Sequence, residues 1–373
     1  MPIYPDASAS APSGRVAQLI LELLPEPVLL VRLGDGGEAE IAYGNEAARE
    51  TFRLNLTGTP LGAAIRRPEV LEAIDEALAL GAPAEVAFET IGVQPRYWRA
   101  FARPLGVGEV VVVLRDETDA RRTERMRADF LANASHELRT PLASLAGFIE
   151  TLRTHAKDDP PARDKFLRIM AEQAARMARL IDDLLSLSRI ELNEHIAPSG
   201  RVDLARTVQD VCDAMRPLTA QRAVTVTLEA EADIEHVTGD RDQLVQVIQN
   251  LIDNAVKYTP RDGQVTVTLE AAPSLDAALA ASRAGVSLSL LSPDTGGAFT
   301  VIRIRDQGPG IARQHLSRLA ERFYRVEGQR SGGTGLGLAI VKHVVNRHRG
   351  GMTVESAEGE GATFSVYFPV SKS

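Results

Sequence analysis

Several features that mark secreted, membrane-spanning or nucleic-acid-binding proteins are scarce in this sequence of 373 residues. Its single cysteine, Cys212, has no partner for an intramolecular disulfide, which is typical of a reducing compartment. Its formal net charge of -8 argues against general nucleic-acid binding, because a basic face is needed to neutralise phosphates. The apolar segment 16–31 is interrupted by glutamates and prolines, and it falls short of the roughly 20 residues of a spanning helix. We therefore expect a cytosolic protein with no nucleic-acid partner and no integral membrane segment.

The N-terminal third predicts a tail followed by one compact domain. Residues 1–14 are rich in Ala, Ser and Pro, a composition that favours disorder. Short β-prone runs surround helical stretches over 15–116, which predicts an α+β domain. Tyr97 and Trp98 are candidate pocket residues there, although core packing is the simpler interpretation. The expected strands are 27–33, 39–43, 84–91, 97–104 and 109–114, and the expected helix is 68–80.

Residues 117–195 carry no strand signal and predict an antiparallel helical hairpin. Apolar side chains recur in steps of three and four along both helices, the spacing of a coiled-coil seam, and 154–164 breaks the pattern. One hairpin has too narrow a core, so we expect a second copy of the chain to complete a dimeric four-helix bundle. The two stripes are Leu131, Ala134, Leu138, Leu142, Leu145, Ile149 and Leu152, then Phe166, Met170, Ala174, Met177, Leu180, Leu184 and Leu187.

Helices and strands alternate from about residue 200 to 370, which predicts an α/β sandwich. A long insertion of low charge, 271–298, separates two of its strands and has no evident function. The expected strands are 224–228, 265–269, 299–305, 352–356 and 362–368, and the expected helices are 243–258 and 336–349.

The segment FLANASHELRTPL, at 130–142, places reactive groups on the first hairpin helix. His136 is offset from the seam by roughly 200° at about 100° per residue, so its ring should face solvent. A neutral imidazole has one free lone pair and needs no prior activation as a nucleophile. Glu137 is placed to orient the ring, and the Thr140 hydroxyl lies one turn further on the same face. Pro141 should distort the helix locally.

Three later segments carry groups suited to a nucleotide. Asn250, Asn254 and Lys257 recur at i, i+4 and i+7, on one helical face, where two carboxamides and an ammonium suit Mg²⁺ and a polyphosphate. DQGPG, which begins at Asp306, offers a carboxylate to an exocyclic amine and glycines that let the backbone approach a flat base. GGTGLGLAIVK, at 332–342, is a glycine loop opening a helix, a setting that favours phosphate. Each glycine segment alone is more often an ordinary turn than a nucleotide site, so the order of the segments along the chain carries the prediction.

The combination His-Glu-Leu-Arg-Thr-Pro at 136–141 resembles the H box of the sensor histidine kinases of two-component systems. The downstream segments resemble, in order, the N, G1 and G2 boxes of the Bergerat-type ATPase fold of these kinases, and ERFYR at 321–325 resembles the F box. The chain has no Walker-type phosphate loop, which argues against a P-loop enzyme. The likeness covers about residues 117–370 and departs from the family at the insertion.

The resemblance implies that His136 takes a phosphoryl group from ATP and passes it to an Asp on the receiver domain of a response regulator. In the family the adjacent Glu is the base, a role carried here by Glu137. Thr140 matches the position that supports dephosphorylation of the partner.

The resemblance also assigns the ATP and Mg²⁺ site. Asn250 would ligate Mg²⁺ and Asp306 would bind adenine. Residues 312–331 would form a mobile lid that carries Arg325 to the transferred phosphoryl group. The other candidates for nucleotide binding are Asn254, Lys257, Tyr258, Gly308, Gly310, Phe323, Gly333, Thr334, Gly335, Leu336, Gly337 and Thr363.

The N-terminal domain is similar to PAS sensor domains, on the strength of YGNEAA at 43–48 and RDET at 115–118, and the overall layout resembles the phosphate-regulon sensor kinases. Two other functions are weighed against a kinase. One is a Bergerat-type ATPase that drives conformational change, against which the H box argues. The other is a non-catalytic dimeric scaffold, which the intact asparagines, lysine and glycines disfavour.

Overall fold

A computed structural model describes residues 14–34, 36–90, 95–157, 159–280, 286–293, 297–326 and 333–371 of the chain. The chain divides into two compact units, Met1–Asp129 and Phe130–Ser373. The predicted tail at 1–14 lies outside the described residues except for Gly14. Within the described ranges, no helix is both long and apolar enough to cross a membrane.

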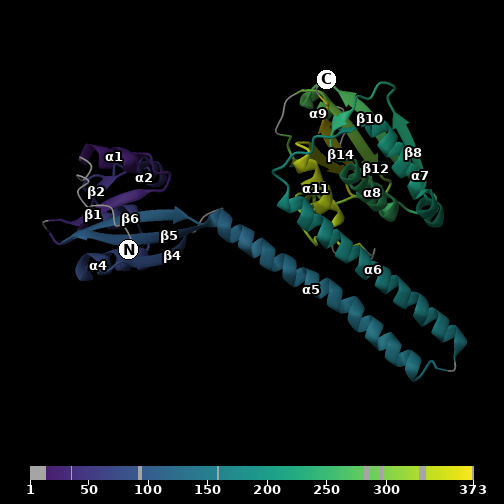
Figure 1. Ribbon diagram of the computed structural model, residues 1–373, viewed down its shortest axis with the longest axis horizontal. Coiled ribbons are helices and arrows are strands. Elements are labelled where there is room, and N and C mark those ends of the chain that lie inside the picture. Colours follow the sequence, from purple (N-terminus) through teal and green to yellow (C-terminus); the bar gives the residue numbers. More distant parts are fainter. Residues whose placement is uncertain are drawn as a thin grey trace, which may run out of the picture. The chain divides into compact units, whose positions relative to one another are not determined.

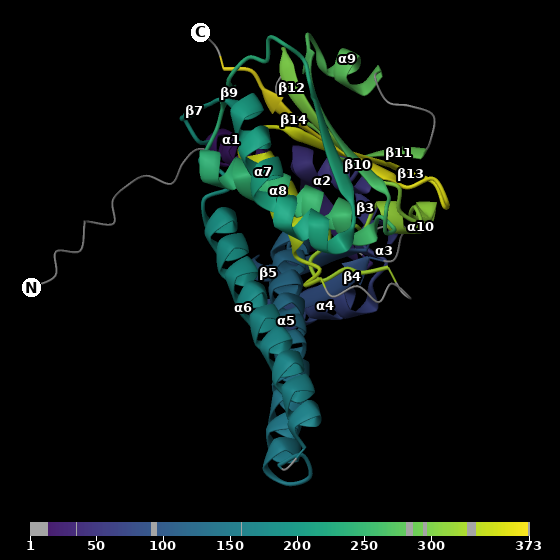
Figure 2. The ribbon, with the colours of Figure 1, turned by 90° about the vertical axis from the view of Figure 1, so that its right-hand side faces the viewer.

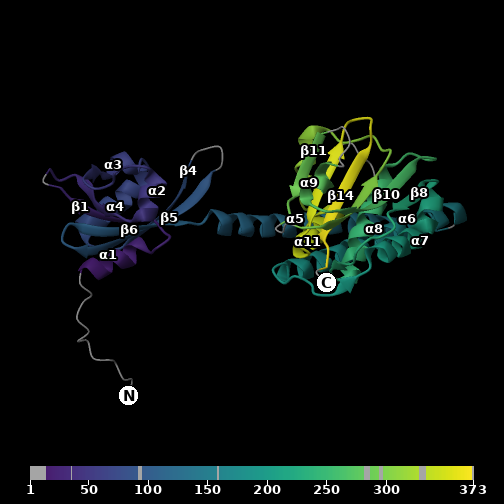
Figure 3. The same cartoon turned by 90° about the horizontal axis from the view of Figure 1, so that it is seen from above.

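The N-terminal unit has an α+β fold, as the sequence predicts, while its kinship to PAS domains stays a prediction. Its elements are α1 (Gly14–Glu22), β1 (Val28–Leu33), β2 (Ala39–Gly44), α2 (Glu46–Phe52), β3 (Thr59–Pro60), α3 (Leu61–Ala64), α4 (Pro68–Leu80), β4 (Ala84–Thr90), β5 (Arg96–Gly106) and β6 (Glu109–Asp116). The strands form one antiparallel sheet in the order β3-β2-β1-β6-β5-β4. Residues of α2, α3 and α4 join the sheet in its hydrophobic core. Figure 3 shows α1 on the side of the sheet away from α3.

Asn45 explains how the YGNEAA segment organises this unit. Its side chain is fully buried, and its Oδ1 accepts hydrogen bonds from the Ala48 N–H at 3.0 Å, which caps α2, and from the Val28 N–H at 2.9 Å. Its Nδ2 donates to three carbonyls between residues 21 and 26. One carboxamide therefore ties the end of α1 to both β1 and α2.

The helical hairpin consists of α5 (Thr118–Arg153), which begins in the N-terminal unit, and α6 (Pro160–Leu192). The two helices run antiparallel and side by side (Figures 1 and 2). The prediction that 154–164 breaks the helix is wrong in extent, because Pro160 and Pro161 open α6. Proline is tolerated there, since the first helical positions need no N–H donor, and Asp159 caps them by accepting from the Ala162 N–H at 3.0 Å. Pro141 lies inside a continuous α5.

The predicted seam of the hairpin is only half covered within one chain. Ala134, Leu180 and Leu187 are buried. Leu131 and Leu142 are 65% and 57% exposed, and Ile149 is 47% exposed. Because such an apolar row on a long helix is costly in water, the hairpin presents a surface that another apolar surface can cover.

The rest of the second unit forms the predicted α/β sandwich. Its elements are β7 (Arg201–Val202), α7 (Leu204–Arg222), β8 (Thr225–Ala230), β9 (Val237–Thr238), α8 (Arg241–Tyr258), β10 (Gln264–Ala272), α9 (Leu275–Ala280), β11 (Val286–Leu291), β12 (Phe299–Arg305), α10 (Arg313–Leu316), α11 (Gly337–Arg347), β13 (Gly351–Ser356) and β14 (Ala362–Pro369). The main sheet has the order β11-β13-β14-β12-β10-β8, in which only β10 and β8 are parallel neighbours. Its core lies against α7, α8 and α11 (Figures 1 and 3). Cys212 lies in α7, partly buried, and burial raises the pKa of its thiol.

The insertion at 271–298 contributes to both an edge and a face of this sheet, although 281–285 and 294–296 lie outside the described residues. Its strand β11 extends the sheet by pairing with β13. Its helix α9 covers the face opposite the other helices, where Ala278 joins Phe299, Val301 and Tyr367 in a separate small core. The buried Arg303 on that face donates to the Ala278 carbonyl at 2.6 Å. The described parts of the insertion are thus built into the sandwich.

Candidate functional site

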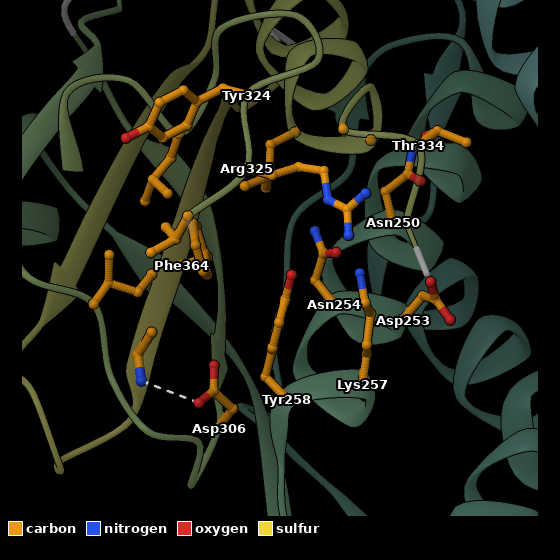
Figure 4. Close-up of a pocket in the computed structure, with 18 of the residues that line it drawn as sticks. Asn250, Asp253, Asn254, Lys257, Tyr258, Asp306, Tyr324, Arg325, Thr334 and Phe364 are labelled. Atoms are coloured by element: carbon orange, nitrogen blue, oxygen red, sulfur yellow. Dashed lines mark hydrogen bonds between the residues drawn. The ribbon is translucent and has the colours of Figure 1, made fainter. Parts of the chain in front are cut away.

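A cavity of about 270 Å³ lies in the second unit, lined by α8, the loop after β12, the segment before α11, strand β14 and the middle of α6. Segments that are far apart in the sequence supply its polar groups (Figure 4). All three segments that the sequence predicts to bind a nucleotide therefore contribute to the same cavity.

Helix α8 supplies the polar wall of the cavity. Asp240 caps the helix by accepting from the Asp242 N–H at 3.0 Å, and an apolar stripe on α8 is buried in the core. The opposite face carries Asn250, Asn254 and Lys257 into the cavity, as Figure 4 shows. The helix that the sequence predicts thus presents the expected side chains together.

Asp306, the residue after β12, supplies a buried carboxylate at the other end of the cavity. It is 5% exposed, and its Oδ1 accepts from the Gly308 N–H at 2.8 Å and the Ala362 N–H at 3.1 Å. Burial raises the pKa of Asp306 despite these two bonds. The other carboxylate oxygen points toward the space between Tyr258 and Phe364 in Figure 4. The site thus holds a fixed acceptor at a partly apolar end of the cavity.

Two glycines let backbone segments pack closely beside Asp306. A Cβ on Gly310, which has φ +72°, would lie 1.9 Å from the Ala357 carbonyl oxygen. A Cβ on Gly361, with φ +78°, would lie 2.2 Å from the Asp306 carbonyl oxygen. No other residue type fits at either position, because both the backbone angle and the space exclude a side chain.

The loop before α11 closes the cavity at the end of Asn250 and Lys257. A Cβ on Gly333 would lie 2.5 Å from the Lys257 Nζ, so the glycine leaves room for the ammonium group. Gly337 begins α11, and its position lies beside the Asn250 Oδ1. Backbone N–H groups at this helix start and the neighbouring ammonium together favour a bound phosphate.

The Thr334 hydroxyl in the same loop donates to the Asp183 Oδ2 of α6 at 2.8 Å and accepts from the Leu336 N–H at 3.3 Å. Asp183 is largely buried, which raises the pKa of its carboxyl group. The hairpin is thereby bonded directly to the loop that closes the cavity.

The exposed His136 lies on α5, and its two predicted helpers make contacts close to it. The Thr140 hydroxyl donates to the His136 carbonyl at 3.3 Å. The Glu137 Oε2 accepts from the Arg176 Nη2 of α6 at 2.9 Å. His136 therefore lies on α5 beside a carboxylate, Glu137, that is held by a residue of α6.

Two family models match the chain over these segments. The model described as "His Kinase A (phospho-acceptor) domain" covers residues 126–193, and "Histidine kinase-, DNA gyrase B-, and HSP90-like ATPase" covers 239–372. The "Phosphate regulon sensor protein PhoR" of Pseudomonas aeruginosa is 36% identical over 266 residues, 70% of this chain and 54% of PhoR. The chain belongs to the sensor histidine kinases. The predicted likeness to the phosphate-regulon sensor kinases is confirmed by the match to PhoR.

Other relatives of the kinase agree with this placement. The "Sensor-like histidine kinase SenX3" of Mycolicibacterium smegmatis is 34% identical over 262 residues, 69% of this chain and 62% of SenX3. The kinase thus spans a little over half the length of these two curated relatives. Histidine kinase ThkA, solved in complex with response regulator protein TrrA, shares the fold, with a TM-score of 0.50, 18% identity, and coverage of 94% of this chain and 98% of ThkA.

The structure brings most of the predicted nucleotide-binding residues of the kinase to the cavity. In Figure 4 the Arg325 guanidinium points toward Asn250 and Asn254. The described part of the predicted lid ends at residue 326, and 327–331 lie outside the described residues. The predicted residues in the cavity wall are Asn250, Asn254, Lys257, Tyr258, Asp306, Gly310, Arg325, Gly333, Thr334, Gly335 and Gly337.

Four predicted residues lie elsewhere. Gly308 is the N–H donor to Asp306, and Leu336 is fully buried in the core. Phe323 packs on Phe130 of α5, with ring centroids 5.8 Å apart. The prediction that Thr363 belongs to the nucleotide site is wrong, because Thr363 does not line the cavity. Successive residues of a strand face opposite sides of the sheet.

The neighbours of Thr363 in β14 show this directly. Ala362 and Phe364 line the cavity, whereas Ser365 and Tyr367, on the same side of β14 as Thr363, meet Arg303 and α9 on the far face. The contact with Asp306 is made instead by the Ala362 backbone N–H.

Four residues of α6 line the cavity without having been predicted. They are Arg176, Arg179, Asp182 and Asp183. They match no motif, and on a long charged helix they are indistinguishable from a solvated face. Only their contacts with residues far along the chain, such as Asp183 with Thr334, identify them.

The bond between α6 and the loop gives a first prediction. Thr334→Val keeps the shape of the side chain but removes the donor to Asp183, leaving a largely buried carboxylate without that hydrogen bond. We expect the free energy of unfolding of the kinase to fall by about 1 kcal/mol, measured by urea denaturation at pH 7. Thr123→Val, which removes an exposed bond to the Asp119 carbonyl, is the control and should change it by less than about 0.5 kcal/mol. Equal effects of the two variants would contradict the prediction.

Proposed function

We propose that the kinase transfers the γ-phosphoryl group of ATP to His136 and then passes it to an aspartate on the receiver domain of a response regulator. The observation that carries this proposal is the convergence of Asn250, Lys257, Asp306 and the α11 loop on one cavity, in a chain that also presents an exposed histidine on α5. The Asp306 carboxylate accepts from the exocyclic amine of adenine, and the glycines beside it leave room for the base.

Mg²⁺ fits the other end of the cavity. The Asn250 carboxamide oxygen is a hard donor, and Gly337 leaves space beside it. Among the described residues no cluster of three or more His, Cys, Asp or Glu side chains forms a metal cage. That agrees with an ion held mostly by the phosphates of the nucleotide, with Asn250 as a protein ligand. Bound there, it would neutralise charge that develops on the phosphates.

The transfer follows from the properties of the chain's own residues. A ring nitrogen of His136 forms a bond to the γ-phosphorus as the bond to the bridging oxygen of ADP breaks, and that electron pair leaves with ADP. Glu137 holds the proton of the second ring nitrogen, which keeps the attacking lone pair available. Lys257 and Arg325 both line the cavity, where their positive charges offset the negative charge of the phosphates.

The same helix face serves the second half of the proposed cycle. The phosphohistidine passes its phosphoryl group to the receiver aspartate, which regenerates His136. The Thr140 hydroxyl, one turn away and bonded to the His136 carbonyl, would orient a water that hydrolyses the phosphorylated regulator. A homodimer joined through α5 and α6 is supported by the exposed apolar row that includes Leu131 and Leu142.

The competing function is an ATPase that drives conformational change without phosphorylating itself. We expect γ-labelled ATP with Mg²⁺ to label the wild-type kinase with a phosphate that is stable in base and lost in acid. His136→Ala should lose at least about 100-fold of the label, because the acceptor nitrogen is gone. His155→Ala, which changes an exposed histidine at the hairpin turn, should label normally. Label retained in His136→Ala would overturn the proposal.

A further inference from the structure

Arg176 is the one described residue of α6 that both lines the cavity and bonds to the residue next to His136. Its Nη2 donates to the Glu137 Oε2 at 2.9 Å, across the two helices of the hairpin. The bridge therefore runs from the cavity wall to the side chain that would orient the acceptor imidazole.

The position of Arg176 is fixed by its own helix. Arg176, Arg179 and Asp183 recur at i, i+3 and i+7, so they share one face of α6, and all three line the cavity. Asp183 is bonded to Thr334 of the loop before α11, about 10 Å along the helix axis from Arg176. A shift of α6 relative to the phosphate-binding loop would therefore move Arg176 as well.

The chemistry of arginine suits two simultaneous contacts. A guanidinium has five N–H donors in a rigid fork, and the bond to Glu137 uses the Nη2 group. The two side chains are 30% and 35% exposed, so the pair is neither sealed in a core nor fully solvated. The remaining donors match the oxygens of a phosphoryl group.

The charge of the cavity wall gives a reason for such a cation. Asp182, Asp183 and Asp253 line it on the side of α6 and α8, where they repel a polyphosphate. A cation on α6 offsets that repulsion. Of the basic residues known to line the cavity within the described part of the chain, only Arg176 is also bonded to Glu137.

We propose that Arg176 is a positioning residue for phosphoryl transfer, which contacts the γ-phosphoryl oxygens of ATP and holds Glu137 in place beside His136. This inference rests on the proposed kinase function and adds a residue that its motifs do not contain. The transfer itself is unchanged, since His136 gains the phosphorus bond, ADP leaves with the electron pair, and Arg176 forms no covalent bond. Its effect is to make the orientation of Glu137 depend on the same side chain that senses the terminal phosphate.

The alternative is that the ion pair only joins α5 to α6. A part-exposed pair of this kind contributes little to stability, typically less than about 1 kcal/mol. A purely structural role would therefore change the melting temperature slightly and leave the rate of labelling per folded molecule unchanged.

The test measures the initial rate of His136 labelling by γ-labelled ATP in the full chain, over a range of ATP concentrations. We expect Arg176→Ala to lower the maximal rate by about 10- to 100-fold, because a misplaced group near the reacting atoms costs that much, while the KM for ATP changes less than about threefold. Arg168→Ala, an exposed arginine on the same helix outside the cavity wall, is the matched control and should label like the wild type. Melting curves of all variants give the fraction of each that is folded at the assay temperature, and each rate is divided by that fraction.

A double variant shows whether Arg176 acts through Glu137. On the Glu137→Gln background, Arg176→Ala should lower the rate by a clearly smaller factor than in the wild type, since the group it positions is already altered and only its contact with the phosphoryl group is still lost. The inference is overturned if Arg176→Ala labels as fast as Arg168→Ala, or if the effects of Arg176→Ala and Glu137→Gln multiply fully. A wild-type kinase that carries no label on His136 would instead count against the proposed function itself.

Discussion

Asp306→Asn is expected to weaken the binding of ATP by about 10- to 100-fold, the range set by loss of a hydrogen bond to a charged acceptor. The Oδ1 of residue 306 must go on accepting from the Gly308 and Ala362 N–H groups. An asparagine therefore places its oxygen there and turns its NH₂ group into the cavity. That donor then meets the exocyclic amine of adenine, which is also a donor. Fluorescence titration with a labelled ATP analogue, followed by displacement with ATP, measures the loss.

The same substitution should leave the kinase at least as stable. Burial raises the pKa of Asp306, so its ionised form opposes folding. A carboxyl group with a raised folded-state pKa contributes stability that is present below its unfolded pKa and is lost as the pH rises through its folded pKa. Asp306→Asn cannot ionise, so its melting temperature should equal or exceed that of the wild type at pH 7. The difference should shrink as the pH falls toward the unfolded pKa of about 4.

Asp233→Asn, at an exposed position outside the cavity wall, is the matched control and should change neither ATP affinity nor its pH dependence. An Asp306→Asn kinase that binds ATP as tightly as the wild type would remove Asp306 from the base-binding site. A variant that is clearly less stable at pH 7 would instead show that its carboxylate contributes to folding.

Gly310→Ala is expected to have the second large effect, on both folding and ATP binding. The added Cβ would lie 1.9 Å from the Ala357 carbonyl oxygen, so the loop after β12 must separate from the turn before β14. The matched control is Gly359→Ala, in the same turn, where φ is +83° but nothing lies within 4 Å of the new Cβ. Both variants carry the cost of a left-handed alanine, and only Gly310→Ala adds the collision.

We therefore expect Gly310→Ala to lower the free energy of unfolding by about 1–3 kcal/mol more than Gly359→Ala does, measured by urea denaturation. ATP affinity should fall in Gly310→Ala alone, because Gly310 lines the cavity and Gly359 does not. Equal losses in the two variants would mean that the close approach of these two backbones does not shape the site.

The parts of this kinase that the sequence predicts well are those with a local physical pattern. Helix α4 occupies 68–80 as predicted, and α8 begins two residues earlier than predicted and ends at the same Tyr258. Strand β12 spans Phe299–Arg305 as predicted, because it is rich in β-branched and aromatic residues, which favour strands. In each case the side chains that make the pattern are those that the core buries.

The errors arise where the result depends on register or on distant contacts. Thr363 is one residue away from Ala362 and Phe364, and in a strand a shift of one residue exchanges the two faces. The contribution of α6 to the cavity is set by pairs such as Asp183 and Thr334, which are 151 positions apart. No local pattern contains that information, and Arg176 shares the same limitation.

The insertion shows a third limit of the sequence. Its low charge and length do not predict that α9 covers the far face of the sheet, where Phe299 and Tyr367 belong to a small apolar cluster. The buried Arg303 on that face is satisfied by Glu270, Ser365 and the Ala278 carbonyl, three partners supplied by different segments.

Phosphorylation of His136 by ATP bound in this cavity is tested by locating the phosphate on the chain. The full kinase is incubated with ATP and Mg²⁺, digested at neutral to basic pH to preserve a phosphoramidate, and its peptides are sequenced by mass spectrometry. We expect phosphate on the imidazole of His136, and none on that peptide from Asp306→Asn at ATP concentrations that saturate only the wild type. Phosphate on a different residue, or release of ADP with His136 unmodified, would contradict it.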